Sequence, residues 1–329
     1  MRVSSSQIFD VGTIGMQRNQ SALLSTQAHL STGKRVNTPE DDPVAAAQAL
    51  VVTQSNEVNN RHIENQGAAG DHLKLLETKL SDVTDNIQSL LDKAVQAGNS
   101  GVLNDADRGA IATDMRQKLA QLLASANSQD GDGQYIFSGF KTNVQPFTSA
   151  TDPVDSTAPA TLAPPQNFAN PYVTYNGDQG QRTLQVDAGR IMSTSENGVD
   201  VFMRISDKSG TLTGGSVFDT IKNMIDTLEK PIAANPTFQT DFKNEMSDLS
   251  ASLDNTLRVR ASVGSRLAEL DALGNSAAGL TAQYQETLSG LQDLDYAKAI
   301  STLSQQQMQL QAAQQSFAKI NSLSLFSIL

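Results

Sequence analysis

Side chains that could carry out catalysis are few in this sequence, and they do not form a catalytic motif. None of the three histidines, His29, His62 and His72, stands in the His-Glu-x-x-His spacing that sets two zinc ligands on one helix face. Gly33-Lys34-Arg35 lacks the upstream glycine and the Ser or Thr of a phosphate-binding loop, and no Gly-x-Ser-x-Gly nucleophile elbow occurs. No cysteine is present to serve as nucleophile or ligand. We therefore expect no enzyme activity, no cofactor and no metal site.

Two aspartate pairs could in principle bind a cation or transfer a proton. Asp41 and Asp42 are adjacent, but no histidine or cysteine lies near them in sequence, and Asp42 followed by Pro43 is typical of a helix start. The stretch Asp130 to Gly133 resembles the opening of a calcium loop, yet the downstream ligands and the closing glutamate are missing. We interpret the first pair as a helix cap and the second as a turn.

The overall charge argues against a nucleic-acid partner. The 329 residues include 35 acidic and 24 basic side chains, a net charge of −11, and no Lys/Arg cluster offsets this balance. No run approaches the ~18 consecutive apolar residues of a membrane span. The N-terminus, MRVSSSQIFD, has no apolar core of a cleaved secretory signal. We expect no nucleic-acid binding, no membrane insertion and no cleaved signal.

The last thirty residues combine a helical stripe with almost no charge. From residue 299 to 329 the only charged side chain is Lys319. Leu303, Leu310 and Phe317 are spaced seven apart. Ile320 lies three residues after Phe317, on a second seven-residue line that is interleaved with the first. This heptad spacing sets one stripe of a helix against another helix. Because a solvent-facing helix usually carries charge on its outer side, this helix needs partners.

The N-terminal segment has the same character. Asp10 and Arg18 are the only Lys, Arg, Asp or Glu side chains among residues 3–33. The spacing of the apolar residues predicts a helix over 5–32 that ends at Gly33. Each terminal helix alone would be marginal in water, so we expect the two to pair. The predicted assembly interface consists of three residues from the first helix and four from the last: Met16, Leu23, Leu30, Leu303, Leu310, Phe317 and Ile320.

Between the two ends the pattern is helical, then β, then helical again. Three-four spacing predicts a helix from Pro43 to about Ala97, which Gly67 and Gly70 could bend, and a second helix capped by Asn104 or Asp105. Abundant charge on these two helices, Arg108 included, predicts a solvated outer side. Short strands are expected at four places: Tyr135–Phe137, Tyr172–Tyr175, Leu184–Val186 and Val199–Ile205.

Helix returns near Ser216. Pro236 could open a last helix that continues to the end of the chain, with a slip of register at 293–295. The predicted fold is mainly α with a β-rich insert, a rod-like nested helical bundle in which first pairs with last. We divide the chain into an N-terminal assembly helix (1–42), two parts of a helical rod domain (43–135 and 216–293), an inserted β-rich domain (136–215) and a C-terminal assembly helix (294–329).

Two stretches carry a family resemblance. LSTGKRVNTPEDDPVAAAQA, residues 30–49, resembles the N-terminal signature of the flagellin superfamily, and LDYAKAISTLSQQQMQLQAA, residues 294–313, resembles its C-terminal counterpart. The resemblance covers nearly the whole chain and is weakest in the insert. Within the superfamily, a protein of the hook-filament junction is favoured over flagellin by NTPEDDPVAA (37–46), DGDGQYIFSGFKT (130–142), YNGDQGQRTLQVDAG (175–189) and the ending LSLFSIL (323–329).

The resemblance implies a structural role in the bacterial flagellum. Such subunits are exported unfolded through the flagellar type III apparatus without signal cleavage and function outside the cell. Their terminal helices fold on assembly. The implied partners are copies of the chain itself in a ring, hook-associated protein 1, flagellin, and an export chaperone at the C-terminal region. Filament flagellin is the main alternative, and a secreted adhesin or an enzyme is favoured less.

Overall fold

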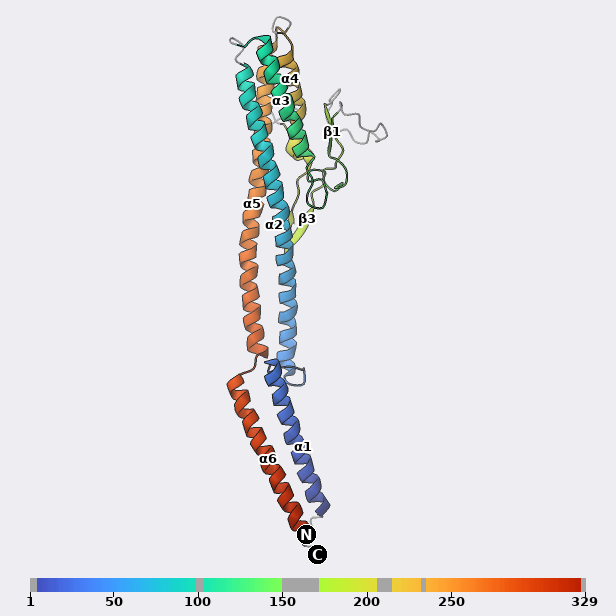
Figure 1. Ribbon diagram of the computed structural model, residues 1–329, viewed down its shortest axis with the longest axis vertical. Coiled ribbons are helices and arrows are strands. Elements are labelled where there is room, and N and C mark those ends of the chain that lie inside the picture. Colours follow the sequence, from blue (N-terminus) through green and yellow to red (C-terminus); the bar gives the residue numbers. More distant parts are fainter. Residues whose placement is uncertain (1–4, 99–102, 150–171, 206–214, 232–234, 327–329) are drawn as a thin grey trace. The chain divides into compact units, whose positions relative to one another are not determined.

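The structure is a computed structural model that describes residues 5–98, 103–149, 172–205, 215–231 and 235–326. Helices dominate it, as predicted, and a small β-rich insert interrupts them (Figure 1). The helices are α1 (Ser5–Thr32), α2 (Pro43–Gly98), α3 (Asp105–Ala126), α4 (Val217–Glu229), α5 (Phe238–Gln292) and α6 (Tyr296–Phe326). The strands are β1 (Phe147–Ser149), β2 (Val173–Tyr175), β3 (Thr183–Asp187) and β4 (Arg190–Ser193).

The chain forms two compact units. The first comprises residues 1–60 and 277–329, and the second comprises residues 61–276. In the first unit α1 lies beside α6, and the start of α2 lies beside the end of α5 (Figure 1). The amide nitrogen of Asn59 donates to the carbonyl oxygen of Ala277 and to the hydroxyl of Thr281, both at 2.9 Å. The predicted nesting, in which the first helix pairs with the last, is therefore confirmed.

Side-chain caps fix several helix starts. The carboxylate of Asp42 accepts from the backbone N–H of Ala45 at 3.0 Å, as expected for an Asp-Pro helix start. Asn104 and Asp107 form a reciprocal capping box at the start of α3. The hydroxyl of Ser216 accepts from the N–H of Asp219 at 3.0 Å and caps α4. These caps satisfy backbone N–H groups that are left free in the first turn of each helix. Because capping residues can be recognised in the sequence, the predicted helix starts lie within one or two residues of the observed ones.

The last helical stretch is interrupted at the predicted slip of register, because the chain leaves the helical path at residues 293–295. α5 ends at Gln292 and α6 begins at Tyr296. Asp295 caps the new helix through the N–H of Lys298 at 3.1 Å, which explains why the heptad register slips here. By contrast, α2 continues without interruption through Gly67 and Gly70.

The core of the second unit is the apolar face of α2 packed against α3, α4 and α5. The fully buried side chains on α2 follow the predicted three-four spacing: Leu73, Leu76, Leu80, Val83, Ile87, Leu90 and Ala94. Met115 and Leu122 from α3, and Ile221 and Ile225 from α4, complete this core. Burial of such apolar area contributes roughly 25 cal/mol per Å².

Arg108 contradicts the expectation that the charges of α2 and α3 face solvent. Its side chain is 0% exposed. The guanidinium pairs with Asp105, donates to the carbonyl oxygen of Lys230 at 3.2 Å, and lies 5.1 Å from the centre of the Phe238 ring. The aromatic face and these oxygens stabilise the buried charge in part, while Nε and Nη1 have no hydrogen-bond partner among the described residues.

The insert contains two small antiparallel sheets. β2 pairs with β1, and β3 pairs with β4, so the strands predicted at Tyr172–Tyr175 and Leu184–Val186 belong to different sheets. Tyr135 makes only an isolated bridge to Gln129, and Val199–Met203 forms a short π-helix, so the strands expected at 135–137 and 199–205 are absent. The apolar runs were buried core segments without strand geometry.

Aromatic side chains hold the insert against the helices. Phe147 from β1 contacts Tyr175, Phe202 and Phe218, with ring centres 5.1 Å, 5.3 Å and 5.2 Å apart. Phe137 meets Phe202 edge to face at 5.2 Å. Such pairs add about 0.5–1.5 kcal/mol each beyond their buried area. This aromatic cluster therefore joins the insert to the start of α4, within the same core as the helices.

Among the described helices, none is both long enough and apolar enough to cross a membrane. The described residues also contain no group of three or more His, Cys, Asp or Glu side chains placed to hold a metal ion.

Candidate assembly interface

The first and last helices face each other along the predicted stripe. Met16, Leu23 and Leu30 on α1 are half-buried, as are Leu303, Leu310 and Phe317 on α6. Ala299 on the interleaved line is fully buried. The side chain of Ile320, the seventh predicted residue, lies outside the described side chains. The six described residues are therefore brought to the facing surfaces of α1 and α6.

The contact is closest around Phe317. Its ring meets that of Phe9 edge to face, with ring centres 5.6 Å apart and planes at 87°. A Cβ on Gly12 would lie 2.8 Å from Cδ2 of Phe317, so the ring occupies space that only a glycine leaves free. Met16 and Ala313 line the same pocket, which has a volume of about 240 Å³. The two helices are thus in contact but leave a pocket beside the ring.

Sequence reasoning missed half of the α1 stripe. The interleaved line on α1 consists of Gly12, Asn19, Thr26 and Gly33, all half-buried and spaced seven apart. Phe9 also belongs to the facing side, seven residues before Met16. Because none of the four interleaved residues is a large apolar side chain, hydrophobic periodicity gave no signal for them. Spacing of small residues alone could have indicated this line.

The outer faces of this helix pair expose large apolar side chains. Val11 is 67% exposed and Leu24 57% on α1, and Met308 is 64% exposed and Ile300 55% on α6. Leu24, next to the stripe residue Leu23, is therefore not covered by α6. Single exposed apolar residues are normal on protein surfaces, but here they stand on helices that lack alternating charge.

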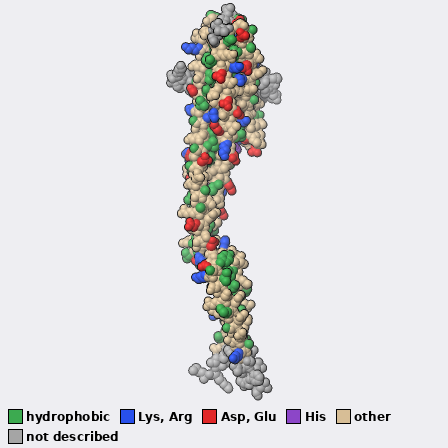
Figure 2. All heavy atoms as spheres, turned by 60° about the vertical axis from the view of Figure 1, so that its left-hand side comes forward, with side chains coloured by type: hydrophobic (Ala, Val, Ile, Leu, Met, Phe, Trp, Pro, Cys, Tyr) green, Lys and Arg blue, Asp and Glu red, His purple; other side chains and the backbone are tan. Residues whose placement is uncertain are grey.

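Charged side chains are sparse over these two helices. In Figure 2 the surface of α1 and α6 shows mostly uncharged atoms, whereas red and blue side chains are frequent over the second unit. The described charged residues of the pair are Asp10, Arg18, Lys298 and Lys319. A helix pair with so little charge on its outer side favours contact with further protein surface.

The turn after α1 is hydrogen-bonded to the turn between α5 and α6. The N–H of Leu294 donates to the carbonyl oxygen of Gly33 at 3.0 Å, and the N–H of Arg35 donates to that of Gln292 at 2.6 Å. The Arg35 guanidinium also donates to the carbonyl oxygen of Leu291 at 2.8 Å. Because backbone groups from both turns satisfy one another, the end of α1 and the start of α6 are held together.

Gly33 makes this geometry possible. Its φ is +70°, in the left-handed region that glycine adopts at helix ends, and its N–H donates to the carbonyl oxygen of His29 at 2.9 Å. A Cβ at this position would lie 2.8 Å from the hydroxyl of Tyr296, the first residue of α6. The glycine therefore ends α1 and admits the start of α6.

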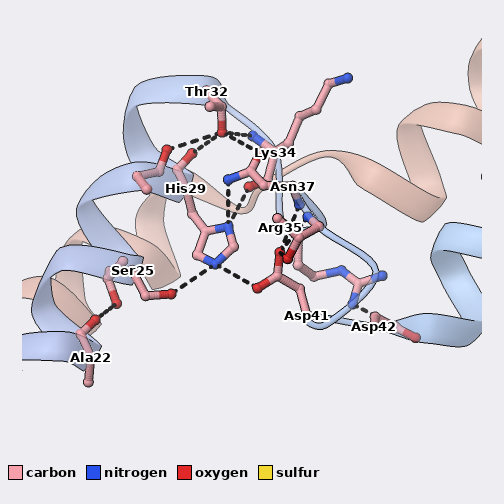
Figure 3. Close-up of polar contacts among 12 residues, drawn as sticks. Ala22, Ser25, His29, Thr32, Lys34, Arg35, Asn37, Asp41 and Asp42 are labelled. Atoms are coloured by element: carbon pink, nitrogen blue, oxygen red, sulfur yellow. Dashed lines mark hydrogen bonds and ion pairs between the residues drawn. The ribbon is translucent and has the colours of Figure 1, made fainter. Parts of the chain in front are cut away.

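His29 belongs to this turn and not to a catalytic site. Figure 3 shows its ring between Ser25, Lys34, Asn37 and Asp41. Nδ1 lies 3.0 Å from the carbonyl oxygen of Lys34, and Nε2 lies 3.3 Å from the hydroxyl of Ser25. Nδ2 of Asn37 also lies 3.1 Å from Nδ1, and Oδ1 of Asp41 lies 3.6 Å from Nε2, so each ring nitrogen has two polar neighbours. The ring ties the end of α1 to the turn.

Both aspartates of the pair are occupied by structural hydrogen bonds. The backbone N–H groups of Thr38 and Asn37 donate to Asp41, and they hold the pKa of this carboxyl below its ordinary value. The N–H of Ala45 and the guanidinium of Arg35 hold the pKa of Asp42 below its ordinary value in the same way. Their carboxylates therefore stabilise the turn and the start of α2.

Comparison with known proteins points to the bacterial flagellum. Residues 13–142 match the family model for the bacterial flagellin N-terminal helical region. Flagellar hook-associated protein 3 of Salmonella typhimurium is 33% identical over all of this chain and 99% of that protein. The protein of the same name from Escherichia coli K12 is 32% identical over the same shares.

Flagellin and solved structures are more distant. A phase 1 flagellin of Salmonella naestved is 27% identical over 37% of this chain and 24% of that flagellin. A putative flagellar hook-associated protein from Vibrio parahaemolyticus covers 77% of this chain and 100% of its own length, with a TM-score of 0.63 and 22% identity. Flagellar hook-associated protein-3 from Legionella pneumophila covers 73% of this chain and 98% of its own, with a TM-score of 0.63 and 20% identity.

Proposed function

This chain belongs to the flagellar hook-associated protein 3 family, and from that membership we propose that it is a structural subunit of the hook-filament junction. In this proposal α1 and α6 form one half of a contact whose other half is supplied by neighbouring subunits. Residues 1–42 and 294–329 act as assembly segments, and the rest of the chain forms the body of the subunit. The role is mechanical and requires no catalysis.

The observation that carries the proposal is the two-sided apolar character of the terminal pair. One side of each helix is used by the other helix, through Leu303, Leu310 and Phe317 on α6. The other side still exposes Val11, Ile14, Leu24, Ile300 and Met308. Burial of such side chains stabilises association by about 1.5–3 kcal/mol for each one fully covered. Contact with further subunits would provide that burial.

The proposed partners follow from the role. Copies of the chain form a ring, hook-associated protein 1 lies on the hook side, and flagellin lies on the filament side. An export chaperone binds the C-terminal region before assembly, because the stripe on α6 would otherwise be exposed to water. The proposed location is outside the cell, reached by the flagellar type III apparatus without signal cleavage.

Filament flagellin is the alternative role, and the extent of similarity argues against it. The flagellin match covers 37% of this chain, whereas the hook-associated relatives match all of it.

Removing the gene separates these two roles. If the chain is a junction subunit, the cells build hooks but spill flagellin into the medium, because the filament has nothing to start on. If it is the flagellin, the cells keep hooks and a secreted junction protein remains detectable. Electron microscopy of the cells and immunoblots of the medium distinguish the two results. A strain that still builds full filaments would contradict the proposed role.

A further inference from the structure

A groove on the second unit has features that its own chain does not use. It runs between α2 and α5 and has a volume of about 610 Å³. The residues that line it include Gly67 and Gly70 on α2 and Gly274 on α5. Asp71 and Asp271 also line it. All of these residues belong to the same compact unit, so the groove is a property of that unit alone.

The glycines are not required by packing within the chain. A Cβ built on Gly67 or Gly70 would meet nothing within 4 Å, and one on Gly274 would only reach ordinary contact, 3.9 Å from Gln66 Oε1. A glycine inside a helix destabilises it relative to alanine. The folded chain therefore keeps an open groove at a cost to its helices that no internal contact explains.

Gln66 presents an unsatisfied acceptor to this groove. Its side chain is 8% exposed, and its Nε2 donates to the carbonyl oxygen of Val186 at 2.7 Å. Because a carbonyl only accepts, this bond fixes the orientation of the amide and leaves Oε1 on the side of Gly274. Oε1 is buried and has no hydrogen-bond partner among the described residues. A buried acceptor without a donor destabilises the fold, and a donor that reaches it removes this penalty.

The charges at the groove favour a cationic donor. Asp71 and Asp271 are both exposed at its sides, and Lys74 is the only basic residue among those lining it. In the described part of the chain no ion pair joins Lys74 to either aspartate. A metal ion is a poor candidate, because the described residues offer no group of three metal-binding side chains.

We propose that this groove receives a lysine or arginine side chain of a neighbouring copy of the chain. The charged head donates to Oε1 of Gln66 and pairs with Asp71 and Asp271, while its aliphatic stem lies along Leu267 and Leu270. The glycines let the neighbouring backbone come close to the two helices. With a net charge of −11 copies repel one another, and this contact offsets part of that repulsion.

This inference rests on the proposed self-association, and filling the groove tests it separately. In a deletion strain the double variant Gly67→Leu/Gly70→Leu is expected to reduce the chain retained on isolated flagella at least tenfold. The control is Gly264→Leu, an exposed α5 glycine outside the groove whose added Cβ also meets nothing within 4 Å. Thermal unfolding by circular dichroism is expected to show no loss of stability in either variant, since leucine favours helix.

A second pair of variants tests the chemistry of the occupant. Asp71→Asn/Asp271→Asn keeps the shape of the groove and removes both charges, and it is expected to reduce retention about tenfold. Asp85→Asn/Asp254→Asn removes two exposed charges from the same helices outside the groove and is expected to leave retention unchanged.

The outcomes separate the two proposals. If the wild-type chain does not restore filaments, the proposed function fails. If the wild type restores them and the filled, folded variant is retained equally well, the groove receives nothing and the inference is wrong. If filling abolishes retention while the Asp71/Asp271 variant is retained normally, the occupant is not cationic, and the inference is overturned in that form.

Discussion

The ring of Phe317 lies on Gly12, and this contact fixes how closely α6 approaches α1. A Cβ on Gly12 would stand 2.8 Å from the ring, while Gly15, one turn further along α1 and in the same pocket, has nothing within 4 Å of such a Cβ. Two glycines of one helix thus differ in what they do. Gly12 admits a neighbouring ring, and Gly15 only leaves space.

Alanine at these two positions is expected to act in opposite directions. Gly15→Ala gains about 1 kcal/mol of helix propensity and adds a methyl group to an open pocket, so the helix pair is stabilised. Gly12→Ala gains the same propensity but forces the ring away, at a cost of about 1–3 kcal/mol for overpacking. The check is the amount of each variant retained on isolated flagella of a deletion strain. Equal retention of the two would contradict the role of Gly12.

The small residues of α1 were harder to predict from the sequence than its large apolar residues. Met16, Leu23 and Leu30 repeat at seven-residue spacing and were found because they are large and apolar. Gly12 and Asn19 face the same partner but carry no hydrophobic signal, because a close helix contact needs small residues on one side. Periodicity therefore identified one line of the stripe and missed the other.

Two predictions outside the terminal helices were wrong for a different physical reason. Phe202 and its neighbours looked like a strand because a short apolar run has no period of its own, and tertiary packing around Phe147 decided its conformation. Arg108 was predicted to face solvent because it is charged. The sequence does not show that the ring of Phe238, more than a hundred residues away, packs against its guanidinium. Long-range contacts determine such details, whereas caps and helix faces are local.

A charge on the facing side of α6 is expected to prevent assembly. Leu310→Asp places a carboxylate on the half-buried stripe between α1 and α6, where burial of a charge is unfavourable. Retention on flagella should fall below detection by immunoblot, with the second unit still folded by circular dichroism. Leu310→Met conserves volume and polarity and should be retained. Normal retention of the Leu310→Asp variant would argue against the seam.

A charge on the outer side of α6 separates pairing within the chain from contact with other subunits. Met308 is 64% exposed in the single chain, so Met308→Asp should leave the α1–α6 contact intact. If neighbouring subunits cover this face, burying the new charge costs several kcal/mol and retention falls at least tenfold. Met308→Gln, which matches the glutamines around it, serves as the control. Equal retention of both variants would mean that this face stays in water.

Gly33 is expected to be sensitive to any side chain. Gly33→Ala places a Cβ at φ +70°, which costs about 1–2 kcal/mol, and brings it 2.8 Å from the Tyr296 hydroxyl. Faster hydrogen exchange at the N–H groups of Arg35 and Leu294 should report the loosened turn.

Combining Gly33→Ala with Tyr296→Phe divides the effect into its two causes. The phenylalanine removes the crowded oxygen, so the double variant should recover part of the protection, and the backbone strain should remain. Full recovery would show that the left-handed conformation itself costs nothing here.

Stability of the second unit is expected to fall as pH rises from about 4.5 to about 7. Burial, followed by the neighbouring charges of Asp241 and Asp248, raises the pKa of Glu245 from 4.5 to about 7, against the opposing hydrogen bond from the Thr227 hydroxyl and the charge of Lys230. The folded chain thus keeps a proton that the unfolded chain releases in this window. By linkage, Glu245 favours folding below pH 4.5, and this contribution is lost as the carboxyl ionises near pH 7.

Glu245→Gln tests this directly, because the amide still accepts from Thr227 and never ionises. At pH 8 the variant should unfold about 3 °C higher than the wild type, and at pH 4 the two should coincide, as measured by calorimetry of the full chain. The exposed Asp85→Asn on α2 controls for a change in net charge. A difference in unfolding temperature that is the same at both pH values would show that ionisation of Glu245 is not its cause.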